Sequence, residues 1–168
     1  MLQYGETGDS GLVCTSTDTD SWRRLNPAER FRVDRALQDR GLRLTPQREA
    51  VCEAILGCPG HICAEHIMET VTIHHRELRM NKTTVYRALD LLLELGLISE
   101  HKCGDGRAQY EPASRGRHSH LICRRCGDLL DLDESLAVTL REGLRALHGF
   151  QAELESYPIF GLCASCRG

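Results

Sequence analysis

One stretch of the sequence constrains the fold of this chain more than any other. It reads Arg107-Ala-Gln-Tyr-Glu-Pro-Ala-Ser-Arg-Gly-Arg-His-Ser-His-Leu-Ile-Cys-Arg-Arg-Cys126. Within it, one carboxylate and two histidines precede a pair of cysteines, at Glu111, His118, His120, Cys123 and Cys126. A second pair with the same spacing lies at the end of the chain, at Cys163 and Cys166. Two Cys-x-x-Cys pairs suit the closed tetrahedral arrangement of a structural zinc site, whereas His and carboxylate ligands suit more exchangeable divalent metals. The sequence therefore predicts two metal sites of different character.

The composition predicts a cytoplasmic protein that does not insert into a membrane. No apolar run approaches the length that spans a bilayer, and the polar N-terminus lacks the features of a signal peptide. Nine cysteines in such a protein indicate metal or redox chemistry rather than a disulfide framework. The net charge of −3 gives no overall attraction to nucleic acid, so DNA binding must depend on local basic residues and helix ends.

Helical patterns dominate the first part of the chain. Four helices are predicted, over residues 26–41, 45–57, 64–71 and 83–96. Asn26 is expected to cap the first of them and Thr83 or Thr84 the last, while residues 72–80 are expected to form a solvated connection. Residues 1–25 contain too little apolar surface to fold and are predicted to be a flexible tail.

Strand patterns follow residue 96. Strands at 97–99 and 108–110 flank a turn at 104–106, and three helices followed by such a hairpin are typical of a winged helix-turn-helix. Later strands are predicted at 121–122, 129–132 and about 151–159, with an amphipathic helix at 135–147. The predicted fold class is α+β. A winged helix-turn-helix DNA-binding domain over 26–112 precedes a small α/β dimerisation and metal-binding domain over 113–168, which carries the four-cysteine zinc site.

Five blocks of the sequence together resemble the ferric uptake regulator family of bacterial metal-sensing repressors. They are Gly41-Leu-Arg-Leu-Thr-Pro-Gln-Arg48, Thr84-Val-Tyr-Arg87, Gly104-Asp-Gly-Arg-Ala-Gln-Tyr-Glu111, His118-Ser-His-Leu-Ile-Cys-Arg-Arg-Cys126 and Cys163-Ala-Ser-Cys166. The resemblance implies a homodimer whose two winged helices bind a palindromic double-stranded DNA operator when metal is bound. It implies no catalytic turnover.

The resemblance also implies which residues contact DNA. Tyr86 and Arg87 match the pair on the recognition helix that contacts bases, and Arg43 matches a basic residue that approaches the minor groove. The chemistry is suitable, because Arg pairs with guanine, Tyr contacts a thymine methyl, and a narrow minor groove attracts a guanidinium. The alternative is that Tyr86 packs in the core and Arg87 is a solvated charge.

The family's sensing site carries over to His61, Glu111, His118, His120 and Asp131. His118 and His120 are two residues apart, and on a strand two imidazoles at this spacing can point the same way. The alternative for Asp131 is an outward-facing strand position with no metal contact. A further metal site of many family members is expected to be absent or rebuilt, because its positions hold Arg117, Ser119 and Glu155.

The regulatory metal is left open by the residues. Nitrogen and oxygen ligands favour Fe²⁺ or Mn²⁺ beside the structural Zn²⁺. His101 and Cys103 on the same hairpin could instead contribute to a site for Zn²⁺, as in a zinc-sensing repressor of zinc uptake genes. Asp131 adds a third alternative, since the peroxide-sensing members carry Asp at this position.

Two other classes of function remain as alternatives to a repressor. A zinc metalloenzyme would use His118, His120 and Glu111 to hold a catalytic ion with an open position. A thiol redox switch would cycle the cysteine pairs between zinc-bound and disulfide forms.

Overall fold

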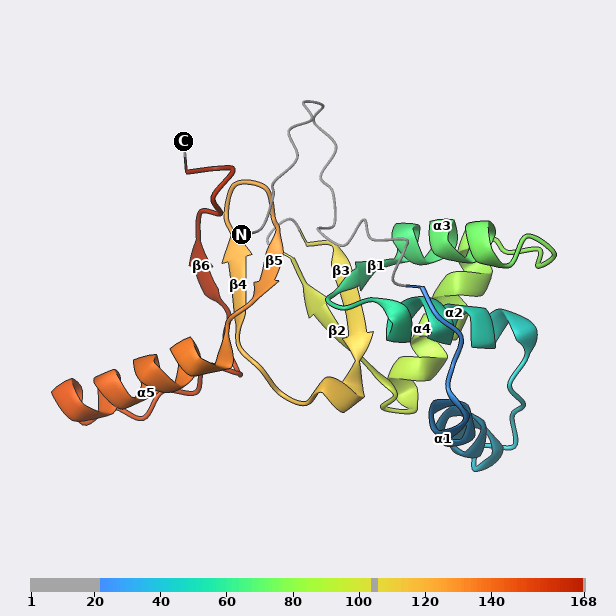
Figure 1. The fold of residues 1–168 in the computed structure, drawn as a ribbon, viewed down its shortest axis with the longest axis horizontal. Helices are drawn as coiled ribbons and strands as arrows, with labels where there is room; N and C mark the ends of the chain where they lie inside the picture. The colour runs from blue at the N-terminus through green and yellow to red at the C-terminus, as the bar shows by residue number, and fades with distance from the viewer. Residues whose placement is uncertain (1–21, 104–105, 168) are drawn as a thin grey trace.

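The computed structural model describes residues 22–103 and 106–167 and shows a helical part followed by a smaller part built on a second sheet (Figure 1). The elements are α1 (Pro27–Gln38), α2 (Pro46–Gly57), β1 (Ile62–Cys63), α3 (Ala64–His74), α4 (Lys82–Glu94), β2 (Ile98–Lys102), β3 (Ala108–Pro112), the 3-10 turn η2 (Ala113–Arg115), β4 (His120–Cys123), β5 (Leu129–Asp131), α5 (Glu134–His148) and β6 (Ile159–Gly161). The predicted α+β class is confirmed. Most of the predicted tail, residues 1–21, lies outside the described residues.

Side chains that accept hydrogen bonds from free backbone N–H groups set the helix starts. The Asn26 side chain accepts from the Glu29 backbone, and the Glu29 carboxylate accepts from the Asn26 backbone, so α1 begins with a capping box. At α2 only one bond of this kind forms, from the Arg48 backbone to the Thr45 side chain at 3.4 Å. The predicted cap of α4 at Thr83 or Thr84 is wrong, because the Asn81 side chain accepts from the Thr84 backbone at 2.9 Å.

The four helices enclose an apolar core. Leu37, Ile55, Ile67 and Leu89 come from four different helices, and all are 0% exposed. Each such side chain stabilises the fold by roughly 1.5–3 kcal/mol. With Leu89 and its neighbours fixed in the core, the opposite face of α4 is turned to solvent.

A three-stranded sheet closes this part of the molecule, in the order β1-β3-β2. The antiparallel hairpin β2/β3 aligns Ser99 with Glu111, and residues 104–105 of the predicted turn lie outside the described part of the chain. Strand β1 was not predicted, because two residues are too few for a periodic pattern. Its pairing of Ile62 with Tyr110 brings His61 beside β3.

Helix α3 extends beyond the predicted end at residue 71 to His74, and the next residue is buried. The prediction of a solvated connection over 72–80 is therefore wrong at its start. His75 contacts the buried Glu53 of α2 at 2.7 Å, and the Trp22 ring stacks on the His74 ring with centroids 4.2 Å apart. The helix is longer than predicted, and His75 is buried, because both histidines contact residues that are distant in the sequence.

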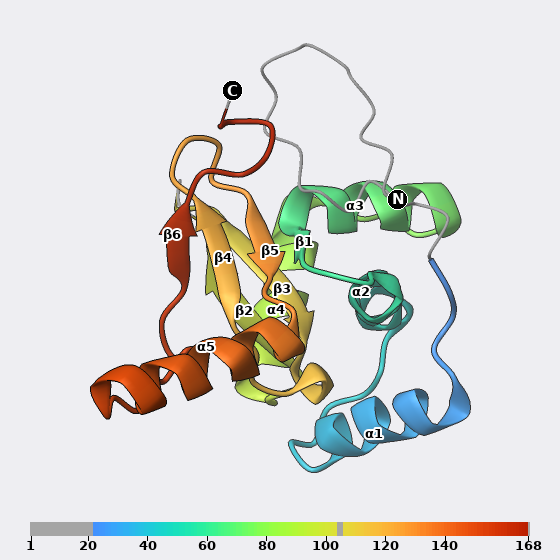
Figure 2. The ribbon, with the colours of Figure 1, turned by 60° about the vertical axis from the view of Figure 1, so that its left-hand side comes forward.

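The second sheet has the order β5-β4-β6, with β4 antiparallel to β5 and parallel to β6. The last strand lies at 159–161 rather than at 151–159. Asp133 caps the start of helix α5, and Gly149 caps its end. The φ of Gly149 is +62°, the left-handed conformation that glycine favours. The helix extends along one side of this part (Figure 2), on the side away from α1–α4 (Figure 1). Among the described residues, no helix is both long and apolar enough to cross a membrane.

Candidate metal centres

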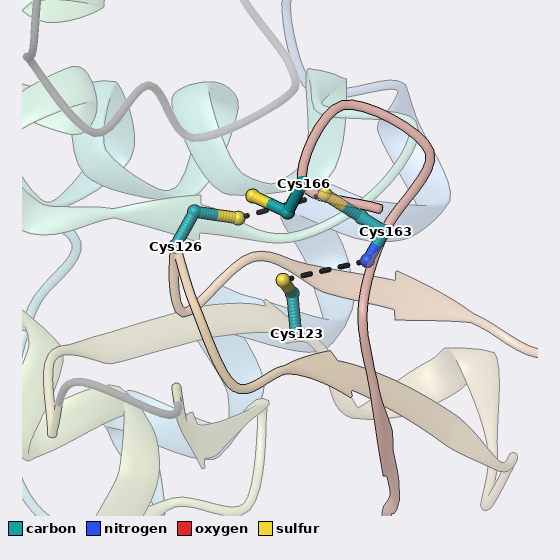
Figure 3. Close-up of side chains that lie close together, drawn as sticks. All are labelled: Cys123, Cys126, Cys163 and Cys166. Atoms are coloured by element: carbon teal, nitrogen blue, oxygen red, sulfur yellow. Dashed lines mark hydrogen bonds between the residues drawn. The ribbon is translucent and has the colours of Figure 1, made fainter. Parts of the chain in front are cut away.

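The four cysteines of the two Cys-x-x-Cys pairs meet at one end of the second sheet. Their sulfur atoms all lie within 4.8 Å of one another, although 37 residues separate the pairs' nearest members (Figure 3). The Cys126 and Cys163 sulfurs are 3.7 Å apart. Tetrahedral zinc with Zn–S bonds of about 2.3 Å places its sulfurs about 3.8 Å apart, so the cluster fits zinc in size and in ligand type.

Backbone pairing assembles this cluster. Cys123 ends β4 and pairs with Gly161 of the parallel strand β6, from which the chain continues to Cys163. Backbone N–H groups of Cys126 and Cys163 lower the pKa of the Cys123 thiol to about 6, and the Cys163 N–H donates to its sulfur at 3.4 Å. Burial raises the pKa of Cys126 to about 12. The described cysteines form no disulfide, so the four thiols remain available to hold a cation.

A second cluster forms between the two sheets. His61, Glu111, His118 and His120 each offer one ligand atom, and these atoms lie within 4.8 Å of one another. The Nε2 atoms of His61 and His120 are 3.1 Å apart. The Glu111 Oε2 atom is 3.4 Å from His118 Nε2 and 3.6 Å from His61 Nε2. Convergent imidazole and carboxylate atoms of this kind are a donor set for a divalent cation.

Asp131 lies at the edge of this second cluster. Its Oδ1 atom is 3.2 Å from His118 Nε2, 3.4 Å from His61 Nδ1 and 3.9 Å from His120 Nε2. Register explains its place, because His120 on β4 pairs directly with Asp131 on β5. The five residues that the sequence singled out are thus brought together, with Asp131 outside the tightest group of four.

Burial lowers the pKa values of two histidines in the cluster. It lowers the pKa of His61 to about 4, against the attraction of Glu111 and Asp131. Burial, together with the neighbouring imidazoles, also lowers the pKa of His120 to about 4. Both rings are therefore neutral near pH 7, which leaves a ring nitrogen of each available to a metal. Burial alone would raise the pKa of Glu111. The hydrogen bond with His101 and the nearby imidazoles outweigh it and lower this pKa below its ordinary value.

Two further side chains hold the carboxylates of the site: His101, which the sequence offered only to the zinc-sensing alternative, and Arg115, which the sequence did not assign. His101 Nε2 lies 2.8 Å from Glu111 Oε1, whereas the other oxygen of that carboxylate faces His61 and His118. Arg115 contacts both Glu111 and Asp131. The spacing of Arg115 four residues after Glu111 is a weak signal, because the intervening turn carries no periodicity.

Cys103 belongs to neither cluster. It is 5% exposed and forms a small apolar group with Ile122 of β4 and Leu129 at the start of β5. This packing joins the β2/β3 hairpin to the second sheet. A cavity of about 200 Å³ opens beside the second cluster, and its lining includes Ser99, Arg117 and Glu155.

A further metal site was expected to be absent or rebuilt, and two of the residues at its positions contact other side chains. Arg117 donates to the Ser156 hydroxyl at 3.3 Å, and Glu155 pairs with Arg141. The buried Ser119 hydroxyl has no hydrogen-bond partner in the described part of the chain. The absence of that site stays a prediction.

The three residues predicted to contact DNA are all exposed. Tyr86 is 43% exposed, and Arg87 also lies on the solvent face of α4, behind which Val85 and Leu89 are buried. Tyr86 is therefore not part of the core, whereas the exposed Arg87 fits both a DNA contact and a solvated charge. Arg43 lies in the loop before α2, and its carbonyl accepts a hydrogen bond from Arg48 at 2.6 Å.

Comparison with known proteins identifies similar chains. The sequence model of the "Ferric uptake regulator family" matches residues 39–155. The ferric uptake regulation protein of Bacillus subtilis is 29% identical over 82% of this chain and 93% of its own, and the peroxide operon regulator of the same organism is 28% identical over 77% and 88%. The solved ferric uptake regulator of Helicobacter pylori shares the fold, with a TM-score of 0.66 and 22% identity over 87% of this chain and 97% of its own.

Proposed function

The chain belongs to the ferric uptake regulator family, and from this premise we propose that it is a metal-dependent transcriptional repressor that binds a palindromic operator as a dimer. The observation that carries the proposal is the second cluster, because its ligands come from both parts of the molecule. His61 and Glu111 lie in the part that contains α4, whereas His120 and Asp131 lie on the second sheet. A site of this kind links metal binding to the relative orientation of the two parts.

The role of each ligand in this proposal follows from its position. His61 precedes β1 and Glu111 lies on β3, so both are fixed to the sheet that closes the α1–α4 core. His118 and His120 lead into β4, which also holds Cys123. A divalent ion bound there would supply the positive charge that the convergent carboxylates and neutral imidazoles lack. The orientation so selected is the one in which two copies of α4 are spaced to enter successive major grooves, so metal and operator strengthen each other's binding.

The DNA contacts in this proposal are made by exposed polar side chains on a rigid helix. Tyr86 and Arg87 project from α4, and Arg43 supplies a guanidinium from the loop before α2. An Arg that pairs with guanine typically contributes about 1–3 kcal/mol of discrimination.

The dimer in this proposal uses the apolar residues that α5 leaves exposed. They include Leu136 at 58%, Leu140 at 40% and Leu147 at 80% exposure. Leu136 and Leu140 are one turn apart and form a patch that a second copy of the helix and sheet would cover.

The ligand set supports Fe²⁺ or Mn²⁺ as the regulatory metal and zinc as the structural one. Among the described residues, nitrogen and oxygen atoms converge in the second cluster, and Cys103 packs against Ile122 and Leu129 instead. Asp131 leaves peroxide sensing through bound iron as a variant of the iron proposal. The zinc-sensing alternative rests on His101, whose Nε2 contacts Glu111.

Operator binding with separate metals tests the proposal. Duplexes would be selected from random DNA with the zinc-loaded protein in the presence of Fe²⁺ without oxygen, Mn²⁺ or buffered Zn²⁺, and affinity would be measured by fluorescence anisotropy. We expect Fe²⁺ and Mn²⁺ to restore tight binding at concentrations where added Zn²⁺ is ineffective. Response to buffered Zn²⁺ alone would identify a zinc-uptake regulator, and tight binding without any added metal would contradict metal dependence.

A further inference from the structure

Arg115, at the end of the turn η2, reaches into the second cluster. Its Nη1 donates to Glu111 Oε2 at 3.2 Å, and its Nη2 donates to Asp131 Oδ2 at 2.7 Å. The two carboxylates lie on β3 and β5, which belong to different sheets. One guanidinium from the connecting turn therefore joins both parts of the molecule, as a divalent ion in the cluster would.

The contact to Glu111 falls on the oxygen that the cluster also uses. Glu111 Oε2 is the atom that faces His118 Nε2 at 3.4 Å and His61 Nε2 at 3.6 Å. The other oxygen, Oε1, is held by His101. A ligand bond from Oε2 to a cation thus has to be made in competition with the Arg115 hydrogen bond, or beside a fixed positive charge.

The charges in the cluster also set Arg115 against an incoming cation. Glu111 and Asp131 bring two carboxylates to the cluster, and the positively charged guanidinium of Arg115 offsets one of them. Arg115 is also one of the groups that act against burial to keep the pKa of Asp131 below its ordinary value. The positive charge that helps to keep Asp131 ionised also repels an incoming cation, because like charges a few ångströms apart interact strongly in a partly buried site.

We propose that Arg115 is an internal counter-cation that competes with the regulatory metal for Glu111 and Asp131 and so sets the metal concentration at which the site fills. The inference rests on the proposed role of the second cluster as a metal site. Without metal, Arg115 joins the two carboxylates and holds the two parts together. With metal, its contact to Glu111 is weakened or lost.

The test compares Arg115→Gln with the matched control Arg117→Gln in the full-length, zinc-loaded protein. Both variants remove one arginine from the same loop, but Arg117 donates to Ser156 rather than to either carboxylate. The Kd for Mn²⁺ would be measured by competition with a fluorescent indicator. We expect Arg115→Gln to bind Mn²⁺ about 10-fold more tightly than the wild type, by removal of one nearby positive charge. Arg117→Gln is expected to stay within about twofold, because a charge directed to solvent-accessible Ser156 is more strongly screened.

Thermal unfolding gives a second readout. Metal-free Arg115→Gln should melt below the wild type, and saturating Mn²⁺ should reduce that difference. An Mn²⁺ affinity of Arg115→Gln that is unchanged or weaker would overturn the inference, since Arg115 would then orient the carboxylates for the metal. An equal gain in Arg117→Gln would overturn it as well, because the effect would be one of general charge.

The outcome is separable from that of the proposed function. Tighter Mn²⁺ binding by Arg115→Gln in a protein whose DNA affinity never responds to metal would support the inference and contradict the repressor. A DNA affinity that responds to metal, together with an Mn²⁺ affinity that Arg115→Gln leaves unchanged, would support the repressor and contradict the inference. Equal Mn²⁺ binding by the wild type and His118→Ala would overturn the inference, because the second cluster would not be the metal site.

Discussion

Glu111 shows how single residues create the second cluster. Its side chain is 3% exposed, yet it is a carboxylate that contacts imidazoles on one side and Arg115 on another. A buried charge of this kind is costly unless it is paired, so the surrounding donors are what allow it to be there. The same donors set the strength with which it can hold a metal.

The two clusters predict different effects for single substitutions. His118→Ala removes the most exposed histidine of the cluster between the two sheets, so the protein should stay folded and keep one zinc per chain while it loses metal-dependent DNA binding. Cys123→Ser removes a ligand from the four-cysteine cluster, so zinc and the fold of the second sheet should be lost together. Elemental analysis and circular dichroism measure both effects. Equal unfolding of the two variants would contradict two sites of different character.

The buried pair of Glu53 and His75 predicts a stability effect far from either cluster. Glu53 is 1% exposed, and its Oε2 lies 2.7 Å from His75 Nε2. His75→Leu leaves the Glu53 charge without this partner and should lower the free energy of unfolding by about 3 kcal/mol. Urea unfolding measures the change, with His148→Leu at the exposed end of α5 as control. A loss no larger than in the control would contradict a stabilising role for the pair.

Residue types in fixed spacing could be predicted, whereas contacts between distant residues could not. The Cys-x-x-Cys pairs and the His-x-His motif are visible because chemistry requires their spacing. His75 looked like a solvated histidine because its partner Glu53 is 22 residues away. Arg115 was missed for the same reason, since Asp131 is 16 residues away on another strand.

At the scale of elements, the capping box of α1 predicts a dependence on pH. Hydrogen bonds from Arg23, together with the Asn26 backbone, lower the pKa of Glu29 from 4.5 to about 2. A carboxylate with a lowered pKa in the folded state stabilises the fold above its unfolded pKa, and this stability is lost as the pH falls from about 4.5 towards 2. Glu29→Gln should therefore cost about 1 kcal/mol near neutral pH and less as the pH falls through that range.

Chemical unfolding at pH 7 and at pH 3 measures this effect. The control is Asp34→Asn on the same helix, which also removes one carboxylate but whose hydrogen-bond partner is the neutral side chain of Gln38. A difference between Glu29→Gln and the wild type that grows at pH 3 would contradict the assignment.

The elements show where local sequence decides structure. Asn26 caps α1 as predicted, and Thr45, where the second helix was predicted to begin, caps α2, because capping depends on residues three positions apart. Strand β1 exists through its pairing with β3, and β6 through its pairing with β4, so neither had a clear local signal. Helix α3 gains its last turn where His74 meets Trp22.

At the scale of the molecule, contacts of several kinds join the described residues of the two sheets. Cys103 packs against Ile122 and Leu129, Arg115 joins Glu111 to Asp131, and the imidazoles of His61 and His120 face each other. The last of these is the contact that a cation between the ring nitrogens would strengthen. Metal binding would therefore act on a junction that apolar packing and an ion pair already hold, which suits a change in orientation rather than folding of the whole chain.

The most direct test of this coupling is a thermodynamic cycle. The Kd of a selected operator duplex is measured with and without Mn²⁺, and the Kd of Mn²⁺ is measured with and without the duplex, for the wild type and for His118→Ala. If the cluster couples metal to DNA, the wild type should show the same factor in both directions, about 5-fold to 150-fold, and His118→Ala should show none. Mn²⁺ that binds at the cluster in the wild type and leaves operator affinity unchanged would contradict the account.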